Sequence, residues 1–107
     1  MSRFLVTYLG GSAPSDPEQA ATIAEAFGRW LAEAGEAVID PGAPLRPGSQ
    51  LANGTPAPRV SIGGYSVIEA DSIDAALAVL KSHPFVTRGG TLQVDESVSV
   101  DEVARRR

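Results

Sequence analysis

The chain has 107 residues, 43% of them hydrophobic, and a formal net charge of −4. This length suits a single domain with a thin core, and the hydrophobic fraction excludes a disordered chain. The negative charge argues against nucleic acid as a partner, because phosphate binding requires a basic surface. The sequence contains no cysteine, which excludes disulfides, thiolate zinc sites and a cysteine nucleophile.

The sequence also indicates where the protein works. No stretch has the length and apolar character of a membrane span. Residues 1–6 lead directly into a strand-like pattern and do not resemble a signal peptide. We therefore expect a cytoplasmic protein with no membrane contact. It would form one domain over residues 1–100, followed by a flexible polar tail at 101–107.

The first half of the chain predicts a strand and a helix. Residues 4–9 alternate as a strand with two mostly apolar faces, which is typical of a central position in a sheet. One face carries Phe4, Val6 and Tyr8, and the other carries Leu5, Thr7 and Leu9. Residues 17–34 have apolar side chains at helical spacing. Asp16 is a suitable N-cap, Pro17 suits the first helical position, and Gly35 is the expected stop.

The second half predicts three strands and a second helix. A short strand at 37–39 would be closed by a turn that begins at Asp40. Residues 43–59, rich in Pro and Gly, read as a long hairpin connection whose apolar anchors are Leu45 and Leu51. The third strand covers 60–70, and its paired glycines 63–64 indicate a bulge or a close backbone approach. Ser72 would cap a helix that ends at Pro84, and residues 91–95 form the fourth strand.

Two successive strand–helix–strand units predict a ferredoxin-like βαββαβ fold of the α+β class. The antiparallel four-stranded sheet would have the order 4-1-3-2, with both helices on one face. The uncovered face would also be apolar, which is typical of an interface. We therefore expect a homodimer packed sheet to sheet around a cavity, a dimeric α+β barrel. A monomer with a half-solvated sheet is the alternative.

Four residues are candidates for a site. His83 is the only histidine and the only side chain whose ordinary pKa suits proton transfer near neutrality. Alternatively, it complements the dipole at the end of the second helix. Asp40 would share one edge of the molecule with His83. Asp40 ends the second strand, and His83 lies near the fourth. These two outer strands are roughly 14 Å apart, so a direct bond is expected only across a dimer. The alternative for Asp40 is to accept backbone bonds in its own turn.

Tyr8 and Tyr65 would place hydroxyls near the same end, as substrate-binding groups or as core and interface aromatics. The run Gly10–Gly11–Ser12 before a helix is a weak candidate for an anion cradle, since it matches neither phosphate-binding fingerprint. One histidine, no cysteine and no paired-histidine spacing predict no metal, and no cofactor is expected.

Residues 61–76 and 82–94 resemble the YCII-related domain family. The resemblance rests on a glycine–tyrosine strand (Gly64–Tyr65) followed by a glycine–threonine strand (Gly90–Thr91), and it covers roughly residues 3–96. It implies a ferredoxin-like fold and a homodimeric barrel. Some relatives use a histidine–aspartate pair for lyase or dehalogenase-type chemistry, with the histidine on the first helix. This chain has no histidine there, and Gln93 stands where many relatives carry an acidic residue.

Two functions follow as hypotheses. The first is a homodimeric small-molecule-binding domain of unknown specificity, non-catalytic or of altered catalysis. Its cavity would be lined by Phe4, Val6, Tyr65 and Val67. The alternative is a small lyase, isomerase or dehalogenase-like enzyme with a small organic substrate in a cleft at the dimer interface. There His83 would transfer a proton, assisted by Tyr8 or by the Asp40 side chain of the second copy.

Overall fold

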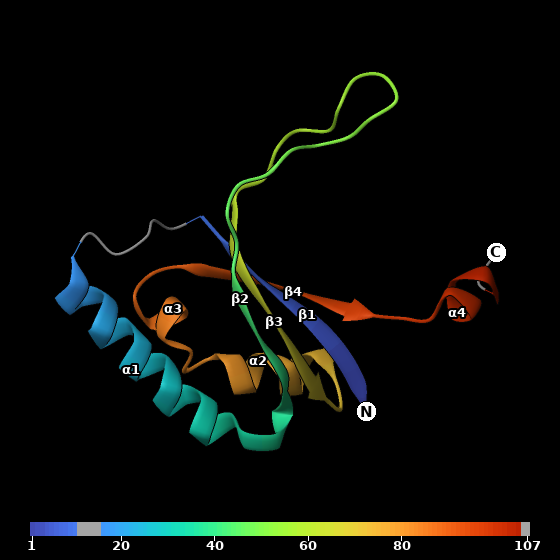
Figure 1. The fold of residues 1–107 in the computed structure, drawn as a ribbon. Helices are drawn as coiled ribbons and strands as arrows, with labels where there is room; N and C mark the ends of the chain where they lie inside the picture. Colours follow the sequence, from blue (N-terminus) through green and yellow to red (C-terminus); the bar gives the residue numbers. More distant parts are fainter. Residues whose placement is uncertain (11–15, 106–107) are drawn as a thin grey trace.

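The computed structural model describes residues 1–10 and 16–105, which form a four-stranded antiparallel sheet with helices on one side (Figure 1). The elements are β1 (Ser2–Leu9), α1 (Pro17–Ala34), the 3-10 turn η1 (Gly35–Ala37), β2 (Val38–Pro44), β3 (Ile62–Ala70), α2 (Ile73–Leu80), α3 (Pro84–Thr87), β4 (Thr91–Ser97) and α4 (Val100–Arg105). The sheet order is β2-β3-β1-β4, which confirms the predicted ferredoxin-like topology.

The hydrophobic core lies between the sheet and the helices. It joins one face of the central strands to α1 and α2. Its buried members are Phe4, Val6, Ile68 and Ala70 from the strands and Trp30, Ala76 and Leu80 from the helices. The predicted alternation along β1 is therefore confirmed. The opposite sheet face carries none of these core residues.

The helix starts follow the sequence signals. The Asp16 Oδ1 atom accepts the Gln19 N–H at 2.7 Å, and the Ser72 hydroxyl accepts the Ala75 N–H at 3.1 Å. Both bonds satisfy backbone donors that a helix leaves unpaired at its N-terminus. At the end of α1, Gly35 has a φ of 56°, a conformation that favours glycine. Within residues 1–10 and 16–105, no helix combines the length and apolar character needed to cross a bilayer.

Strand β2 is longer than the sequence predicted. The expected turn at Asp40 is a bulge, and the strand continues to Pro44. The Asp40 Oδ1 atom accepts the Gly42 N–H at 2.8 Å. Gly42 has a φ of 75°, and a Cβ there would lie 1.7 Å from the Tyr65 carbonyl oxygen. The Asp–Pro–Gly run therefore bends this edge strand without ending it.

The paired glycines of β3 accommodate neighbouring backbone, as the sequence predicted. The register between β1 and β3 shifts by one residue at Gly63. A Cβ on Gly63 would lie 3.2 Å from the Gly10 carbonyl oxygen, and one on Gly64 would lie 3.1 Å from that of Ala43. Glycine is favoured at both positions because the neighbouring strands come this close.

The connection between β2 and β3 extends away from the sheet (Figure 1). Residues 45–61 contain no helix or strand. The Arg59 Nη2 atom donates to the Gly48 carbonyl at 2.9 Å and joins the two arms of the loop. Leu51, expected as an apolar anchor, is fully exposed, and Leu45 is 44% exposed. The anchoring prediction is wrong because the loop projects too far to reach the core.

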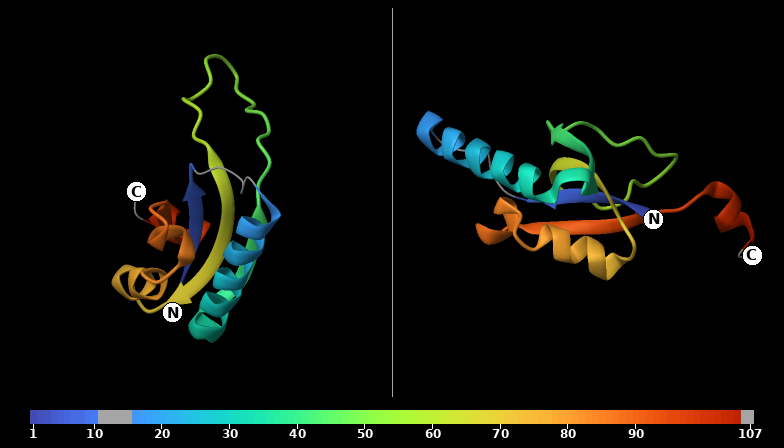
Figure 2. Two further views of the ribbon diagram at one scale, coloured as in Figure 1. Left: turned by 90° about the vertical axis from the view of Figure 1, so that its left-hand side faces the viewer. Right: turned by 90° about the horizontal axis from the view of Figure 1, so that it is seen from below.

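Two short helices were not predicted. Helix α2 ends at Leu80 instead of reaching Pro84, and α3 follows it, with His83 as its N-cap. Helix α4 replaces the irregular tail expected after residue 100, because the Ser99 hydroxyl accepts the Glu102 N–H at 3.0 Å. Figures 1 and 2 show α4 set apart from the body of the domain, beyond the end of β4.

Candidate functional site

A chain of hydrogen bonds runs through the helix-covered side of the sheet. The Tyr8 hydroxyl lies 2.9 Å from the Ser66 Oγ atom and 2.9 Å from the His83 Nε2 atom. The Ser66 hydroxyl donates to the Pro41 carbonyl at 2.8 Å. Side chains of β1, β3 and the segment before α3 thus meet at one point, and the chain of bonds ends on the bulge of β2.

The direction of each bond follows from its fixed ends. The Phe85 N–H donates to the His83 Nδ1 atom at 3.0 Å, so the proton of the neutral imidazole resides on Nε2. Nε2 therefore donates to the Tyr8 hydroxyl. Because the Ser66 hydroxyl donates to the Pro41 carbonyl, Ser66 accepts the hydrogen of Tyr8. Each of the three side chains is satisfied in this order.

The imidazole of His83 is held inside the core. His83 is 2% exposed. Its ring centroid lies 4.5 Å from that of Trp30 and 5.6 Å from that of Phe27. Burial lowers the pKa of His83 to about 4, and the positive charge of Arg88 adds to this effect. Burial also raises the pKa of Tyr8. Both side chains are therefore neutral at pH 7.

The structure places His83 at a different helix end from the one that the sequence predicted. The residue was expected at the C-terminus of the second helix, where a positive charge would complement the dipole. Instead, it caps the N-terminus of α3 through its Nδ1 atom. A proton on Nδ1 would face the Phe85 N–H and break that bond. The geometry thus favours a neutral imidazole with both nitrogens engaged, which gives His83 little freedom to exchange protons with solvent.

Asp40 and His83 are not brought together. Asp40 is exposed on the edge strand β2 and bonds the Gly42 N–H, whereas His83 is buried beneath α1. The chain of hydrogen bonds instead ends on the neighbouring Pro41 carbonyl, through Ser66. Ser66 was missed, although one signal was available. Its hydroxyl occupies a core-facing position between apolar residues of β3, and such a group needs a partner.

Tyr65 lies on the opposite face of the sheet from Tyr8. There Thr7 pairs with Tyr65 on one side and with Gln93 on the other, so the three form a polar row across β3, β1 and β4. Thr7 is 8% exposed. In the part of the chain that the structure describes, its buried Oγ1 atom has no hydrogen-bond partner. Leaving such a group unpaired costs roughly 1–3 kcal/mol.

The rest of this open face is apolar beside the row and charged at its far end. Leu5, which is 42% exposed, pairs with Val67. Asp95 stands on the other side of Leu5 and accepts a hydrogen bond from the Gln93 amide at 3.1 Å. Farther along β1, the Arg3 guanidinium lies 3.7 Å from the Glu69 carboxylate.

The expected cavity combined residues that the sheet separates. Phe4 and Val6 lie beneath the helices, whereas Tyr65 and Val67 lie on the open face. The prediction of one cavity lined by all four residues is therefore wrong. The error arose because both faces of β1 are apolar, and the sequence does not show which one the helices cover.

Two weaker predictions concern other ligands. In residues 1–10 and 16–105, no group of three His, Asp or Glu side chains could hold a metal ion. The anion cradle proposed at Gly10–Gly11–Ser12 depends on Gly11 and Ser12, which lie outside the described residues.

Comparisons with known proteins bear on the fold. No protein-family model and no curated protein sequence matches the chain. Among solved structures, the chain is similar to 5-chloro-2-hydroxyhydroquinone dehydrochlorinase (TftG) from Burkholderia phenoliruptrix AC1100, in complex with 2,5-dihydroxybenzoquinone. The TM-score is 0.57 and the identity 18%, over 94% of this chain and 97% of that chain. The likeness shows a shared fold, in agreement with the fold that the YCII-related resemblance implies.

Proposed function

We propose that the chain is a YCII-related, homodimeric small-molecule-binding domain, non-catalytic or of altered catalysis. Its ligand would lie on the open sheet face, over the row of Tyr65, Thr7 and Gln93. The family assignment, the dimer and the ligand site are each part of this proposal.

The unpaired Thr7 hydroxyl carries the proposal. It lies at the centre of the open face, between a phenol and an amide that can both form hydrogen bonds. Gln93 is exposed, so rotation of its side chain would let a ligand reach Thr7. A hydroxyl that a ligand satisfies no longer incurs the cost of being buried and unpaired.

The row favours a planar ring with oxygens on opposite sides. Neighbouring strands lie about 4.8 Å apart, a spacing at which one ring can meet polar groups from two or three strands. The apolar pair Leu5 and Val67 beside the row would contact the ring face. A relative in fold binds 2,5-dihydroxybenzoquinone, a molecule of this class, which supports an oxygenated six-membered ring as ligand.

A second copy would close the site. Leu5 and Val67 form an apolar strip on a face that the helices of the described residues leave uncovered. Packing two such faces about a two-fold axis would bury the strip and enclose the polar row in a cavity.

The alternative is a small enzyme in which His83 transfers a proton. The dehydrochlorinase activity named for the similar structure and the Tyr8–His83 hydrogen bond support it. In this alternative, Tyr8 would relay the proton, because its hydroxyl is the group in contact with Nε2. The binding proposal has the stronger support, since His83 is buried and both of its nitrogens are engaged.

An NMR titration distinguishes the two. Amide spectra of the labelled protein would be recorded with 2,5-dihydroxybenzoquinone and with hydroxyquinols. The binding proposal expects shifts centred on Tyr65, Thr7 and Gln93, and a weaker affinity in Thr7→Val. Thr22→Val, on the exposed face of α1, is the matched control. Absence of shifts would overturn the binding proposal, and shifts centred on His83 would favour the enzyme.

A further inference from the structure

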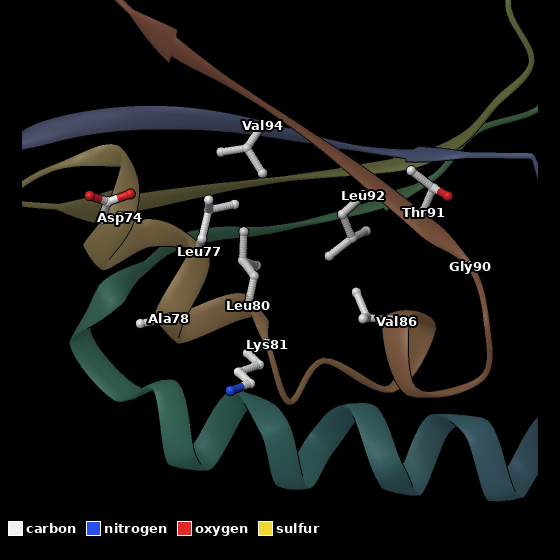
Figure 3. A pocket seen from close by; sticks show the side chains of 10 residues that line it. All are labelled: Asp74, Leu77, Ala78, Leu80, Lys81, Val86, Gly90, Thr91, Leu92 and Val94. Atoms are coloured by element: carbon white, nitrogen blue, oxygen red, sulfur yellow. The ribbon is translucent and has the colours of Figure 1, made fainter.

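An apolar groove lies between α2 and β4, on the helix side of the sheet (Figure 3). Its volume is about 500 Å³. Its apolar lining comprises Leu77, Ala78, Leu80, Val86, Leu92 and Val94. Asp74 and Lys81 border it from α2, and it extends to Gly90 and Thr91 at the start of β4. Leu77 is 49% exposed and Val86 is 36% exposed, so the groove is open to an apolar partner.

Helix α4 presents apolar side chains that the domain leaves uncovered. Val100 is 84% exposed and Val103 is 49% exposed, and Val98 just before them is 41% exposed. Figures 1 and 2 show this helix beyond the end of β4, away from the core. A short helix is marginally stable in water without a packing partner. Its valines therefore point to a docked state.

In this structure α4 does not occupy the groove of its own chain. The groove runs along β4 from Gly90 and Thr91 to Val94, and α4 follows the end of that strand at Ser97. The chain leaves β4 in the direction away from the groove (Figures 1 and 2). A second copy can therefore supply an α4 to the groove without a reversal of the chain after Ser97.

We propose that α4 of a second copy occupies this groove. Strand β4 is an edge strand, and an edge presents backbone groups that can pair with another strand. When two β4 strands pair antiparallel about a two-fold axis at Val94, Ser97 of one copy lies opposite Thr91 of the other. The chain that continues from Ser97 then passes Thr91 and reaches the groove of the second copy.

Charge supports this arrangement. The first turn of α4 carries Asp101 and Glu102. The end of the groove that it would enter holds Lys81, with Arg88 close by in the sequence before Gly90. The acidic start of the helix would thus meet basic side chains, which favours this orientation.

The edge contact is independent of the sheet-to-sheet contact. Edge pairing uses a two-fold axis perpendicular to the sheet, whereas the sheet-to-sheet dimer uses an axis between the two sheets. The two axes are compatible with one tetramer of 222 symmetry. A substitution can therefore disrupt one of these interfaces and leave the other intact.

Cysteine cross-linking tests the proposal, because the natural chain has no cysteine. Val103→Cys and Val86→Cys would be prepared separately, mixed and mildly oxidised. We expect a disulfide-linked dimer containing one chain of each variant. Ala21→Cys, on the exposed side of α1, replaces Val86→Cys as the control. Cross-linking with Val86→Cys no greater than with the control would overturn the proposal.

Light scattering provides the second measurement. The double variant Val100→Asp and Val103→Asp changes exposed side chains, so the fold should persist. We expect the mass of the assembly to fall by half. The exposed Val60→Asp variant, in the long loop, should leave the mass unchanged. An unchanged mass in the double variant would also overturn the proposal.

Discussion

Tyr8 and His83 are joined by a 2.9 Å hydrogen bond between the phenol oxygen and Nε2, and their rings meet edge to face at 87°. This contact connects β1 to the segment between α2 and α3, 75 residues away along the chain. Ser66 extends it to the Pro41 carbonyl of β2. Because each group in this order has one defined role, the loss of one hydroxyl leaves a buried donor and a buried acceptor unpaired.

Tyr8→Phe should therefore destabilise the domain. The change would leave the His83 Nε2–H without an acceptor and the Ser66 hydroxyl without its donor. An unsatisfied buried polar group costs roughly 1–3 kcal/mol, and we expect a loss of about that size. Urea unfolding followed by the fluorescence of Trp30 would measure it. Tyr65→Phe, on the open face, is the matched control and should change stability by less than about 0.5 kcal/mol. Equal losses would contradict the hydrogen-bond order.

The low pKa of His83 gives folding a defined dependence on pH. In the unfolded chain His83 binds its proton near pH 6.5, whereas in the folded chain it does so only near pH 4. The folded state thus binds fewer protons in this interval. The contribution of His83 to the stability of the fold is complete above pH 6.5 and is lost as the pH falls toward 4. At about 1.4 kcal/mol per pKa unit, the loss amounts to about 3 kcal/mol.

Comparison with His83→Asn separates the titration of His83 from that of the carboxylates. Asparagine does not titrate and is a good N-cap, so α3 should keep its first bond. The variant should be less stable at pH 7.5, because it loses the contact with Tyr8. Its stability should also fall less steeply than that of the natural protein between pH 6.5 and 4. Parallel curves would show that His83 does not titrate as proposed.

Local chemistry in the sequence determined most of the fold. Asp16, Pro17 and Gly35 correctly predicted the two ends of α1, because helix termini favour these residue types. Strand order followed from the two strand–helix–strand units. The short helices α3 and α4 were missed, because each depends on one capping side chain, His83 or Ser99. The continuation of β2 was not predicted, because the Asp–Pro–Gly run that begins at Asp40 is typical of a turn.

The candidate site was harder to predict, because it depends on contacts distant in sequence. The pattern identified Tyr8, Tyr65 and His83 as polar groups of interest. It did not show that Tyr8 and Tyr65 lie on opposite faces of the sheet. Nor did it show that Thr7 would be buried without a partner in the described chain. These facts depend on which face of β1 the helices cover, and both faces of that strand are apolar.

Gly42→Ala should disrupt the bulge in β2. Its φ of 75° disfavours any side chain, and the new Cβ would lie 1.7 Å from the Tyr65 carbonyl oxygen. Relief would require β2 to move away from β3, with a loss of at least roughly 2 kcal/mol. Gly48→Ala is the control, because a Cβ there meets nothing within 4 Å. Thermal unfolding would compare the two, and similar melting temperatures would contradict this role of Gly42.

Leu5→Arg should disrupt the proposed sheet-to-sheet dimer. Leu5 is 42% exposed on the open face, so the monomer can accommodate arginine, whereas a second sheet packed over it cannot bury the charge. We expect the mass measured by light scattering to fall by half. Ile73→Arg provides a control of equal exposure, 43%, on the helix side. It should keep the mass of the natural protein. An unchanged mass for Leu5→Arg would contradict sheet-to-sheet packing.

Thr7→Val should separate stability from binding. The two side chains have nearly the same shape, and valine removes a hydroxyl that is buried without a partner in the described chain. The ligand-free protein should therefore gain about 1 kcal/mol of stability in urea unfolding. In Thr22→Val, the control on α1, the lost hydroxyl is exposed and bonded to the Glu18 carbonyl, so no gain is expected. A gain in stability together with weaker binding of 2,5-dihydroxybenzoquinone would indicate a hydroxyl kept for its ligand. A loss of stability would instead assign Thr7 a partner within the fold.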